Sequence, residues 1–195
     1  MEKIDIIHNQ YINLDKVKDL YSLQTWNPKK ISSFHDSIGN EQTPLVKLPG
    51  LAKHLGVGNI LLKDESHRFG LNAFKALGAS YAMHRQVEKN PQIKIFCTAT
   101  DGNHGRAVAW VAKKLNRKAV IYMPKWTIPE RLKAIEHEGA EVHVIDQSYD
   151  IAVEIASARV TQGKDIGNNY WSLIQDTAWE GFEEIPLDIM KGYWT

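Results

Sequence analysis

The sequence predicts an α/β fold, with a parallel sheet and helices flanking both of its faces. Strand-like and helix-like segments alternate, with expected strands at 94–98, 118–123, 141–145 and 170–174, and helices at 105–115, 129–137 and about 150–160. Short turns marked by glycine or proline separate them, as is typical of right-handed βαβ crossovers. The segment 105–115 also carries an apolar stripe at helical spacing (Ala107, Val108, Val111 and Leu115), which predicts a helix that faces the core.

The chain before this alternation is less regular. We expect irregular structure or short helices over 1–42, an extended segment at 43–50, a helix at 51–55 that ends near Gly56, and a short buried strand at 59–63. A polar connection over 64–72 then leads into a helix from Ala73 onward, with Phe74, Leu77 and Tyr81 at helical spacing and Asn72 as a candidate N-cap. Near the end, 185–193 is amphipathic.

Composition narrows the class of protein. With 43% hydrophobic and 24% charged residues and a net charge of +1, the chain suits a globular protein and gives no support for binding a polyanion. No apolar stretch approaches the roughly 20 residues that cross a bilayer, and the N-terminal residues do not resemble a signal peptide. We therefore expect a cytoplasmic protein. The single cysteine, Cys97, lies in an apolar run and predicts a small buried side chain.

Lys75 falls in the first turn of the helix predicted from Ala73 onward. Backbone N–H groups and the helix dipole disfavour a positive charge there, and a neutral amine is the form that attacks a carbonyl carbon. Most lysines taken at random are simply solvated, but the apolar neighbours of Lys75 favour a buried setting. Lys75 is therefore a candidate for a covalent anchor.

Two acids follow the ends of predicted strands. Asp101 opens the turn Asp101-Gly102-Asn103-His104-Gly105, whose glycines allow close backbone approach and whose N–H groups could receive an anion. Such a turn is weak evidence alone, since every βα unit needs one. Asp176 follows another strand, and because ligands of open parallel sheets bind beyond the carboxyl ends of strands, the two acids could face one crevice. The alternative for Asp176 is an N-cap.

Three signatures, at 69–75, 101–106 and 175–181, resemble the fold-type II pyridoxal-phosphate (PLP) enzymes, the group of threonine dehydratase and cysteine synthase. Within that group the chain is most similar to the diaminopropionate ammonia-lyases, over about 43–195. The resemblance implies a tryptophan synthase β-like fold, with 1–90 as the N-terminal part of the large PLP-binding domain, 91–178 as a small Rossmann-like domain and 179–195 as a return to the large domain. It also implies that the second half of the fold is missing here, so the chain alone is expected to be a poor or inactive lyase.

The same resemblance implies roles for the candidate residues. Lys75 would form a Schiff base with pyridoxal 5′-phosphate and move protons at the substrate Cα, and Asn103 would hydrogen-bond the 3′-oxygen of the cofactor. The loop of Asp101, Gly102, Asn103 and His104 would bind the substrate, the alternative for His104 being a surface or structural residue. Related dehydratases usually have serine where this chain has Asp101, and a carboxylate suits a substrate with a second ammonium group. Asp101, Asp176 and Lys75 would divide the proton transfers.

We therefore expect α,β-elimination of 2,3-diaminopropionate to pyruvate and ammonia by a homodimer that acts on a small amino acid. One alternative is a serine/threonine dehydratase-like β-eliminase, which Asp101 opposes. A second is a truncated, non-catalytic binding or interaction protein. The chain has no G-x-G-x-x-G turn, which opposes a third alternative, nucleotide binding. No histidine or cysteine grouping has metal-ligand spacing, so we predict no catalytic metal. We also predict no nucleic-acid or membrane partner.

Overall fold

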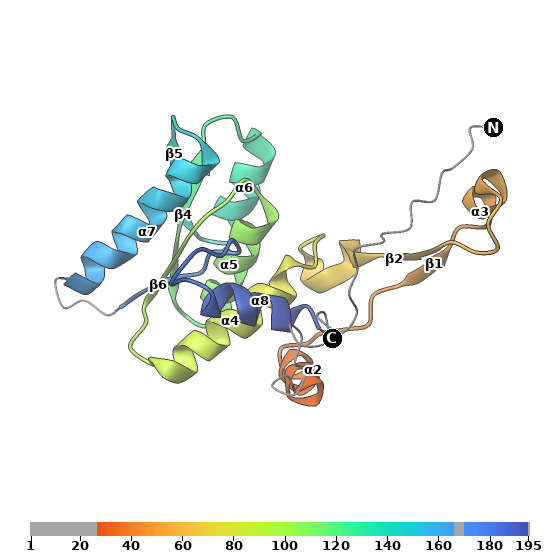
Figure 1. Ribbon diagram of the computed structural model, residues 1–195, viewed down its shortest axis with the longest axis horizontal. Coiled ribbons are helices and arrows are strands. Elements are labelled where there is room, and N and C mark those ends of the chain that lie inside the picture. Colours follow the sequence, from red (N-terminus) through yellow and green to blue (C-terminus); the bar gives the residue numbers. More distant parts are fainter. Residues whose placement is uncertain (1–26, 166–169, 195) are drawn as a thin grey trace.

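The computed structural model describes residues 27–165 and 170–194. A layered α/β body carries a slender arm that projects well away from it (Figure 1). The sequence predictions for residues 1–26 lie outside the described residues. No helix in the described part of the chain combines the length and apolar character needed to cross a bilayer.

Four parallel strands form the sheet of the body in the order β5-β4-β3-β6. They are β3 (Ile95–Ala99), β4 (Lys118–Pro124), β5 (Glu141–Ile145) and β6 (Trp171–Leu173). The parallel sheet that strand and helix alternation predicts is therefore confirmed, with ends within one or two residues of those expected. Because the strands are parallel and β3 pairs with β6, the segments that follow these two strands meet at one edge of the sheet.

Helices cover both faces of this sheet (Figure 1). Helix α5 (Asn103–Lys114) packs on β3 and β4 together with α4 (Lys75–Lys89) and α6 (Pro129–His137), while α7 (Tyr149–Asp165) covers the opposite face. The larger apolar cluster, around Met83, Phe96 and Ile121, fills the first face. A smaller one beneath α7 contains Cys97, where burial raises the thiol pKa to about 12. Cys97 is thus the small buried side chain predicted.

Helix α8 (Glu184–Gly192) returns to the body and crosses α4. The crossing is close because both helices have glycine there. A Cβ on Gly78 would lie 2.7 Å from the carbonyl oxygen of Ile189, and one on Gly192 would lie 2.6 Å from that of Leu77. Helix α2 (Pro28–Ser37) also packs on α4, where His35 Nε2 donates a hydrogen bond to the Leu77 carbonyl at 2.9 Å.

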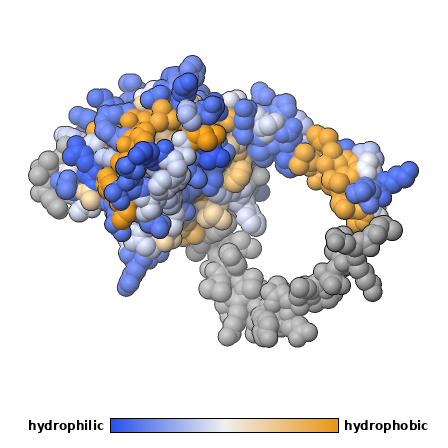
Figure 2. All heavy atoms as spheres, turned by 90° about the horizontal axis from the view of Figure 1, so that it is seen from above, coloured by the Kyte–Doolittle hydropathy of each residue, from blue (hydrophilic) through white to orange (hydrophobic). Residues whose placement is uncertain are grey.

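The arm consists of β1 (Leu45–Lys47) and β2 (Leu61–Lys63), which pair antiparallel, and helix α3 (Pro49–Leu55) between them. Helix α3 ends as predicted at Gly56, whose φ of 67° is left-handed. The strand predicted at 59–63 is present as β2, but its predicted burial is wrong, since Leu61 and Leu62 are 53% and 49% exposed. No described element covers this two-stranded ribbon, and its apolar side chains form an open patch (Figure 2).

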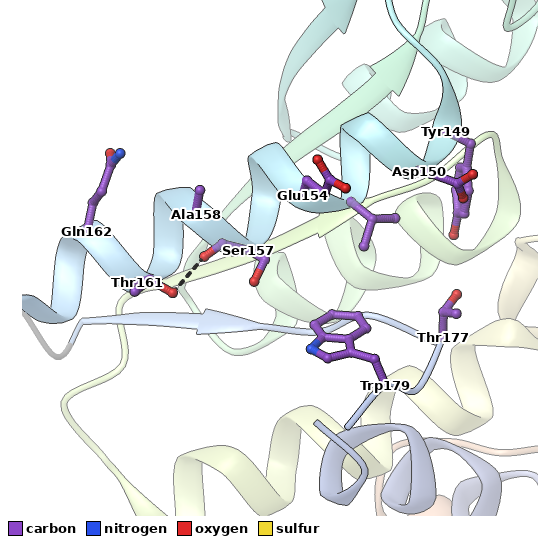
Figure 3. A pocket seen from close by; sticks show the side chains of 10 residues that line it. Tyr149, Asp150, Glu154, Ser157, Ala158, Thr161, Gln162, Thr177 and Trp179 are labelled. Carbon is purple, nitrogen blue, oxygen red and sulfur yellow. Dashed lines mark hydrogen bonds between the residues drawn. The ribbon is translucent and has the colours of Figure 1, made fainter. Parts of the chain in front are cut away.

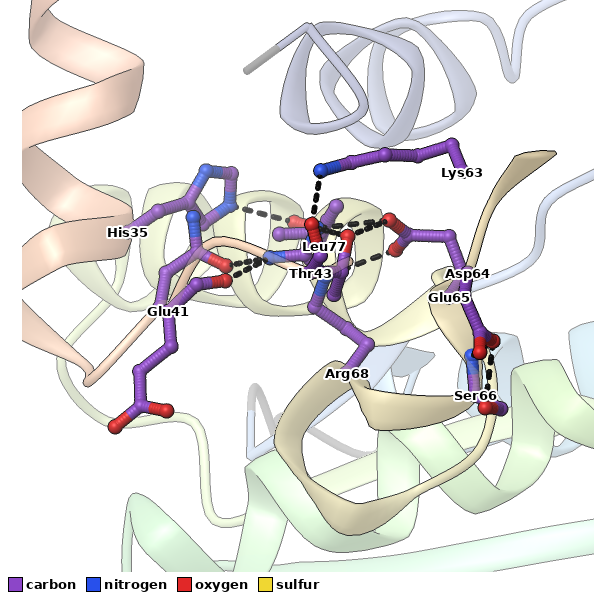
Figure 4. Close-up of polar contacts among 10 residues, drawn as sticks. His35, Glu41, Thr43, Lys63, Asp64, Glu65, Ser66, Arg68 and Leu77 are labelled. Atoms are coloured by element: carbon purple, nitrogen blue, oxygen red, sulfur yellow. Dashed lines mark hydrogen bonds and ion pairs between the residues drawn. The ribbon is translucent and has the colours of Figure 1, made fainter. Parts of the chain in front are cut away.

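A polar network fastens the base of the arm to the body (Figure 4). Arg68 belongs to the 3₁₀ turn η2 (Glu65–Gly70) and donates to both carboxylate oxygens of Glu65, at 2.8 and 2.9 Å. Its guanidinium also donates to the carbonyl of Glu41 at 2.9 Å and to the Asn40 side chain. The Thr43 hydroxyl donates to Glu65 at 2.6 Å. The chain before β1 is thereby tied to the chain after β2.

The start of α4 differs from the prediction in one respect. The first helical residue is Lys75, and Phe74 takes the N-cap position without a side-chain hydrogen bond. The predicted N-cap, Asn72, instead has a left-handed φ of 58° within the turn before the helix. Phe74 is consequently 43% exposed, whereas Leu77 and Tyr81 are buried as their spacing predicts. Lys75 is in the first helical turn, as expected.

Candidate active site

The ammonium of Lys75 pairs with the carboxylate of Asp176. Lys75 Nζ donates to Asp176 Oδ2 at 3.0 Å, with side chains that are 30% and 20% exposed. Lys75 is the first residue of α4, and Asp176 lies in the segment that follows β6. Two of the three predicted catalytic residues are therefore in direct contact although they are far apart in the sequence.

Gln175 holds the ends of β3 and β6 together. Its side chain is fully buried, and its Oε1 accepts hydrogen bonds from the backbone N–H of Ala99 and the hydroxyl of Thr98, both at 3.0 Å. Its Nε2 donates to the Tyr149 hydroxyl at 2.9 Å. Gln175 thus fixes the backbone from which Asp176 projects. Gln175 was not among the predicted site residues, although its place between an apolar strand and Asp176 was a usable signal.

His104, the second residue of α5, lies behind Asp176. Its Nε2 lies 2.8 Å from the carbonyl oxygen of Ile174, and since a carbonyl only accepts, this nitrogen carries a proton. Its Nδ1 faces Asp176 Oδ2 at 3.7 Å and has no hydrogen-bond partner among the described residues. The imidazole is only 4% exposed. The predicted role of His104 in contacting substrate is untested, and its ring is directed toward Asp176.

The charges of these three residues are coupled. Burial lowers the pKa of His104, which the Asp176 carboxylate opposes. Burial raises the pKa of Asp176, but its two nitrogen neighbours, His104 and Lys75, would more than offset this wherever they carry a proton, so the pKa lies below its ordinary value. Because a buried imidazole is held neutral and Lys75 Nζ is the nearer nitrogen, we assign the cation that stabilises Asp176 to Lys75.

The loop that starts at Asp101 is organised by Thr100. The Thr100 hydroxyl accepts hydrogen bonds from the N–H groups of Gly102 and Gly105, at 3.0 and 3.1 Å. Gly105 is required here, because a Cβ on it would lie 2.2 Å from Thr100 Cγ2. The N–H groups of Asn103 and His104 remain without hydrogen bonds to described residues at the start of α5. Such a helix start favours an anion.

Asp101 and Asn103 lie at the surface of this loop. The side chain of Asp101 is 72% exposed, and its nearest charged partner is Arg131, whose Nη1 lies 3.9 Å from Asp101 Oδ2 and donates to the Asp101 carbonyl at 3.0 Å. Asp101 has no hydrogen bond or ion pair with Lys75 or Asp176 in the described structure. Burial raises the pKa of Tyr149, and the charges of Asp176 and Asp101 add to this effect. Asn103 is exposed as the first residue of α5.

Two aromatic rings flank Lys75. Its Nζ lies 5.8 Å from the ring centroids of both Phe74 and Tyr193, which pack edge to face. The Tyr193 hydroxyl is buried and finds no partner among the described residues. Burial raises the pKa of Tyr193, with a smaller contribution from Asp176, so the phenol stays neutral. The amphipathic stretch predicted at 185–193 includes Tyr193, but Tyr193 was not among the predicted site residues.

A hollow of about 620 Å³ lies beside this cluster rather than on it (Figure 3). It opens between α7 and the chain after β6, and is lined by residues that include Tyr149, Glu154, Thr177 and Trp179. Neither Lys75 nor Asp176 lines it, although Thr177 adjoins Asp176. The titratable cluster therefore marks the candidate site better than the hollow does. No group of three or more potential metal ligands occurs among the described residues.

Comparison with curated proteins gives long matches. The chain is 46% identical over 188 residues to the diaminopropionate ammonia-lyase of Salmonella typhimurium, covering 85% of this chain and 45% of that protein. It is 44% identical over 211 residues to the diaminopropionate ammonia-lyase of Escherichia coli K12, covering 99% and 51%. A threonine dehydratase of Solanum lycopersicum is 36% identical over 118 residues, covering 60% and 19%. The chain spans about half the length of the lyases it matches.

Solved structures give the same picture. The apo diaminopropionate ammonia-lyase of Escherichia coli superposes with a TM-score of 0.79 at 43% identity, covering 85% of this chain and 49% of that one. Its complex with an aminoacrylate-PLP azomethine reaction intermediate gives 0.78 at 46% identity, covering 85% and 45%. These likenesses confirm the predicted fold-type II architecture. With residues 37–192 matching the family model as well, the chain belongs to the pyridoxal-phosphate dependent enzyme family.

Proposed function

We propose that the protein is a PLP-dependent ammonia-lyase that eliminates the β-amino group of 2,3-diaminopropionate to give pyruvate and ammonia. The observation that carries the proposal is the Lys75–Asp176 pair at the edge of the parallel sheet, beside the Asp101 loop. Identities of 44–46% to diaminopropionate ammonia-lyases support the substrate. Since the chain spans about half of those enzymes, the proposal concerns the protein expressed from the complete reading frame.

The residues present fit an aldehyde cofactor. Lys75 offers an amine at a partly exposed helix start, and two buried polar groups near it, His104 Nδ1 and the Tyr193 hydroxyl, have unused hydrogen-bonding capacity. In this proposal Lys75 would hold pyridoxal 5′-phosphate, and Asn103 would hydrogen-bond its 3′-oxygen. The cofactor supplies an electron sink that stabilises negative charge at the substrate Cα.

The chain's own groups then divide the remaining tasks. Lys75 removes the proton from the substrate Cα, and Asp176 keeps its Nζ in position. The free N–H groups at the start of α5 bind the substrate α-carboxylate, with Gly102 allowing close approach. Asp101 binds the second ammonium of the substrate through a charged hydrogen bond. That bond also keeps the β-nitrogen protonated, and a protonated amine is the better leaving group.

A dehydratase-like β-elimination of serine or threonine is the second candidate. The 36% identity to a threonine dehydratase over 118 residues favours it. Asp101 separates the candidates, because a neutral hydroxyl leaving group gains nothing from a carboxylate. A cytoplasmic location, a homodimer and the division into 1–90, 91–178 and 179–195 also belong to the proposal, on the strength of the family resemblance.

The first experiment locates the cofactor. The protein from the complete reading frame is loaded with pyridoxal 5′-phosphate, reduced with borohydride and mapped by peptide mass spectrometry. We expect the label on Lys75, and we expect pyruvate release from 2,3-diaminopropionate to be lost in Lys75→Ala but kept in Lys89→Ala, which changes the last residue of the same helix. A label on another lysine would remove the central assignment.

The second experiment tests the substrate. Asp101→Ser should lower kcat/KM for 2,3-diaminopropionate about ten- to a hundredfold relative to serine, because losing a charged hydrogen bond costs roughly 1.5–3 kcal/mol. Arg131→Gln is the matched control, since it removes the neighbour of Asp101 and keeps the carboxylate. Equal losses on both substrates would favour the dehydratase-like reaction while leaving the cofactor assignment intact.

A further inference from the structure

His104 Nδ1 is a buried nitrogen that points at a carboxylate without bonding to it. The hydrogen bond from Nε2 to the Ile174 carbonyl fixes the ring, so a neutral His104 presents its Nδ1 lone pair to Asp176 Oδ2 at 3.7 Å. A lone pair and a carboxylate oxygen repel each other. An imidazolium in the same place would instead donate a charged hydrogen bond to Asp176.

Asp176 Oδ2 is also the atom that accepts the hydrogen bond from Lys75, at 3.0 Å. One oxygen therefore lies between two nitrogen bases, one that is charged and bonded and one that is neutral and unbonded. We propose that Lys75 and His104 share a single proton through Asp176. The proton leaves Lys75 Nζ for Asp176 Oδ2 and passes on to His104 Nδ1, so that ammonium, carboxylate and imidazole become amine, carboxylate and imidazolium.

This transfer conserves the charge of a partly buried cluster. Asp176 has one cationic partner before and after it, so the carboxylate is never left unpaired, which would be costly. The transfer also produces the neutral amine that attacks a carbonyl. The inference takes its purpose from the proposed function, but the proton position can be measured without any cofactor.

Among the described residues, the other titratable groups near Asp176 do not compete with Lys75 and His104 for this proton. Burial, with a smaller contribution from the Asp176 charge, raises the pKa of Tyr149, on α7, and of Tyr193, after α8, and keeps both phenols neutral. Around His104 the charges are Asp176, which favours the imidazolium, and Lys75, which disfavours it. Loss of the Lys75 charge therefore removes the repulsion and leaves the attraction.

The test is a pH titration of ¹⁵N-histidine-labelled, cofactor-free protein, followed by the NMR shifts of Nδ1 and Nε2. In wild type we expect His104 to be neutral with its proton on Nε2. In Lys75→Met its midpoint should rise by about one pH unit or more, because Asp176 then has no other cation. In Lys75→Met/Asp176→Asn the rise should vanish. His35, whose Nε2 donates to the Leu77 carbonyl, is the internal control and should not shift.

An unchanged His104 midpoint in Lys75→Met would overturn the proposal, and so would a rise that persists in the double variant. If Lys75→Met does not fold, wild type decides: pyridoxal 5′-phosphate is added, borohydride mapping shows whether it is on Lys75, and His104 should then become imidazolium. A labelled Lys75 with a neutral His104 overturns the shared proton. A label elsewhere contradicts the proposed function; Lys75 then keeps its proton, and an imidazolium at His104 beside it would overturn the shared proton, whereas a neutral His104 agrees with it.

Discussion

The body and the arm use similar apolar residues with opposite results. In the body, Phe96 and Met83 are fully buried because helices cover both faces of the sheet. In the arm, Leu45 and Leu61 are more than half exposed because β1 and β2 form a single layer. A strand buries its side chains only when a second layer packs on it. The candidate site lies on the body, where buried contacts such as those of Gln175 hold its residues in place.

The largest expected effect comes from removing a core side chain. Phe96→Ala should lower the free energy of unfolding by about 3–5 kcal/mol, because it opens a cavity between β3 and α5. Leu61→Ala, at a 53% exposed position of the arm, should change it by less than about 0.5 kcal/mol. Urea denaturation monitored by circular dichroism measures both. Equal losses would mean that the arm is covered in solution.

Arg68 connects the two regions and should have the next largest effect. Its hydrogen bond holds the pKa of Glu65 below the ordinary value, against the effect of burial. Arg68→Met should cost about 2–3 kcal/mol, less than a fully buried pair, because the Glu65 side chain is a quarter exposed. Hydrogen exchange should accelerate in β1 and β2 more than in β3 and β4.

Arg85→Met is the matched control for Arg68→Met. Arg85 also pairs with a glutamate three residues away, Glu88, at 2.8 Å, but both side chains are about a third exposed. Its loss should cost no more than about 0.5 kcal/mol. Uniform acceleration of exchange over the whole chain in Arg68→Met would contradict a specific role at the base of the arm.

The crossing of α4 and α8 should tolerate little added volume. Gly78→Ala places a methyl group 2.7 Å from the Ile189 carbonyl and should cost about 1–2 kcal/mol, since overpacking outweighs the gain in helix propensity. Gly58→Ala in the arm meets no atom within 4 Å and should be close to neutral. Thermal melts of the two variants compare them directly. A neutral Gly78→Ala would show that α8 can move away from α4.

Local patterns were sufficient to predict most of the body. The helix at 129–137 and the strand at 141–145 begin and end where their flanking glycine and proline residues predict. The burial of 59–63 was predicted wrongly because an apolar run looks the same whether or not a second layer covers it. The start of α5 was placed two residues late, since Asp101-Gly102-Asn103 reads as a turn although Asn103 is already helical.

The sequence predicted the residues of the candidate site better than it predicted the contacts between them. Lys75 and Asp176 stood out because each follows a recognisable turn or strand end. Their direct contact depends on the pairing of β3 with β6, two strands separated by β4 and β5 in the sequence, and no local pattern encodes it. The inward direction of the His104 ring and the clamp formed by Gln175 depend on the same pairing.

The smallest effect concerns the two acids of the site. The pKa of Asp176 is lowered in the folded state, so its carboxylate adds stability that is complete above the unfolded pKa, near ~3.9, and is lost as the pH falls through the folded pKa. Asp176→Asn should therefore cost on the order of 1 kcal/mol at pH 7 and less at pH 2.

Asp101→Asn separates this effect from a general loss of negative charge. Asp101 is 72% exposed and its closest cation lies 3.9 Å away, so replacing it should leave the unfolding midpoint in urea unchanged at both pH values. Asp176, at 20% exposure and 3.0 Å from Lys75, should show the pH-dependent difference. If Asp176→Asn cost the same at pH 7 and pH 2, its carboxylate would contribute through packing rather than charge. Asp176 and Asp101 would then differ in their effect on substrate specificity and not in their effect on stability.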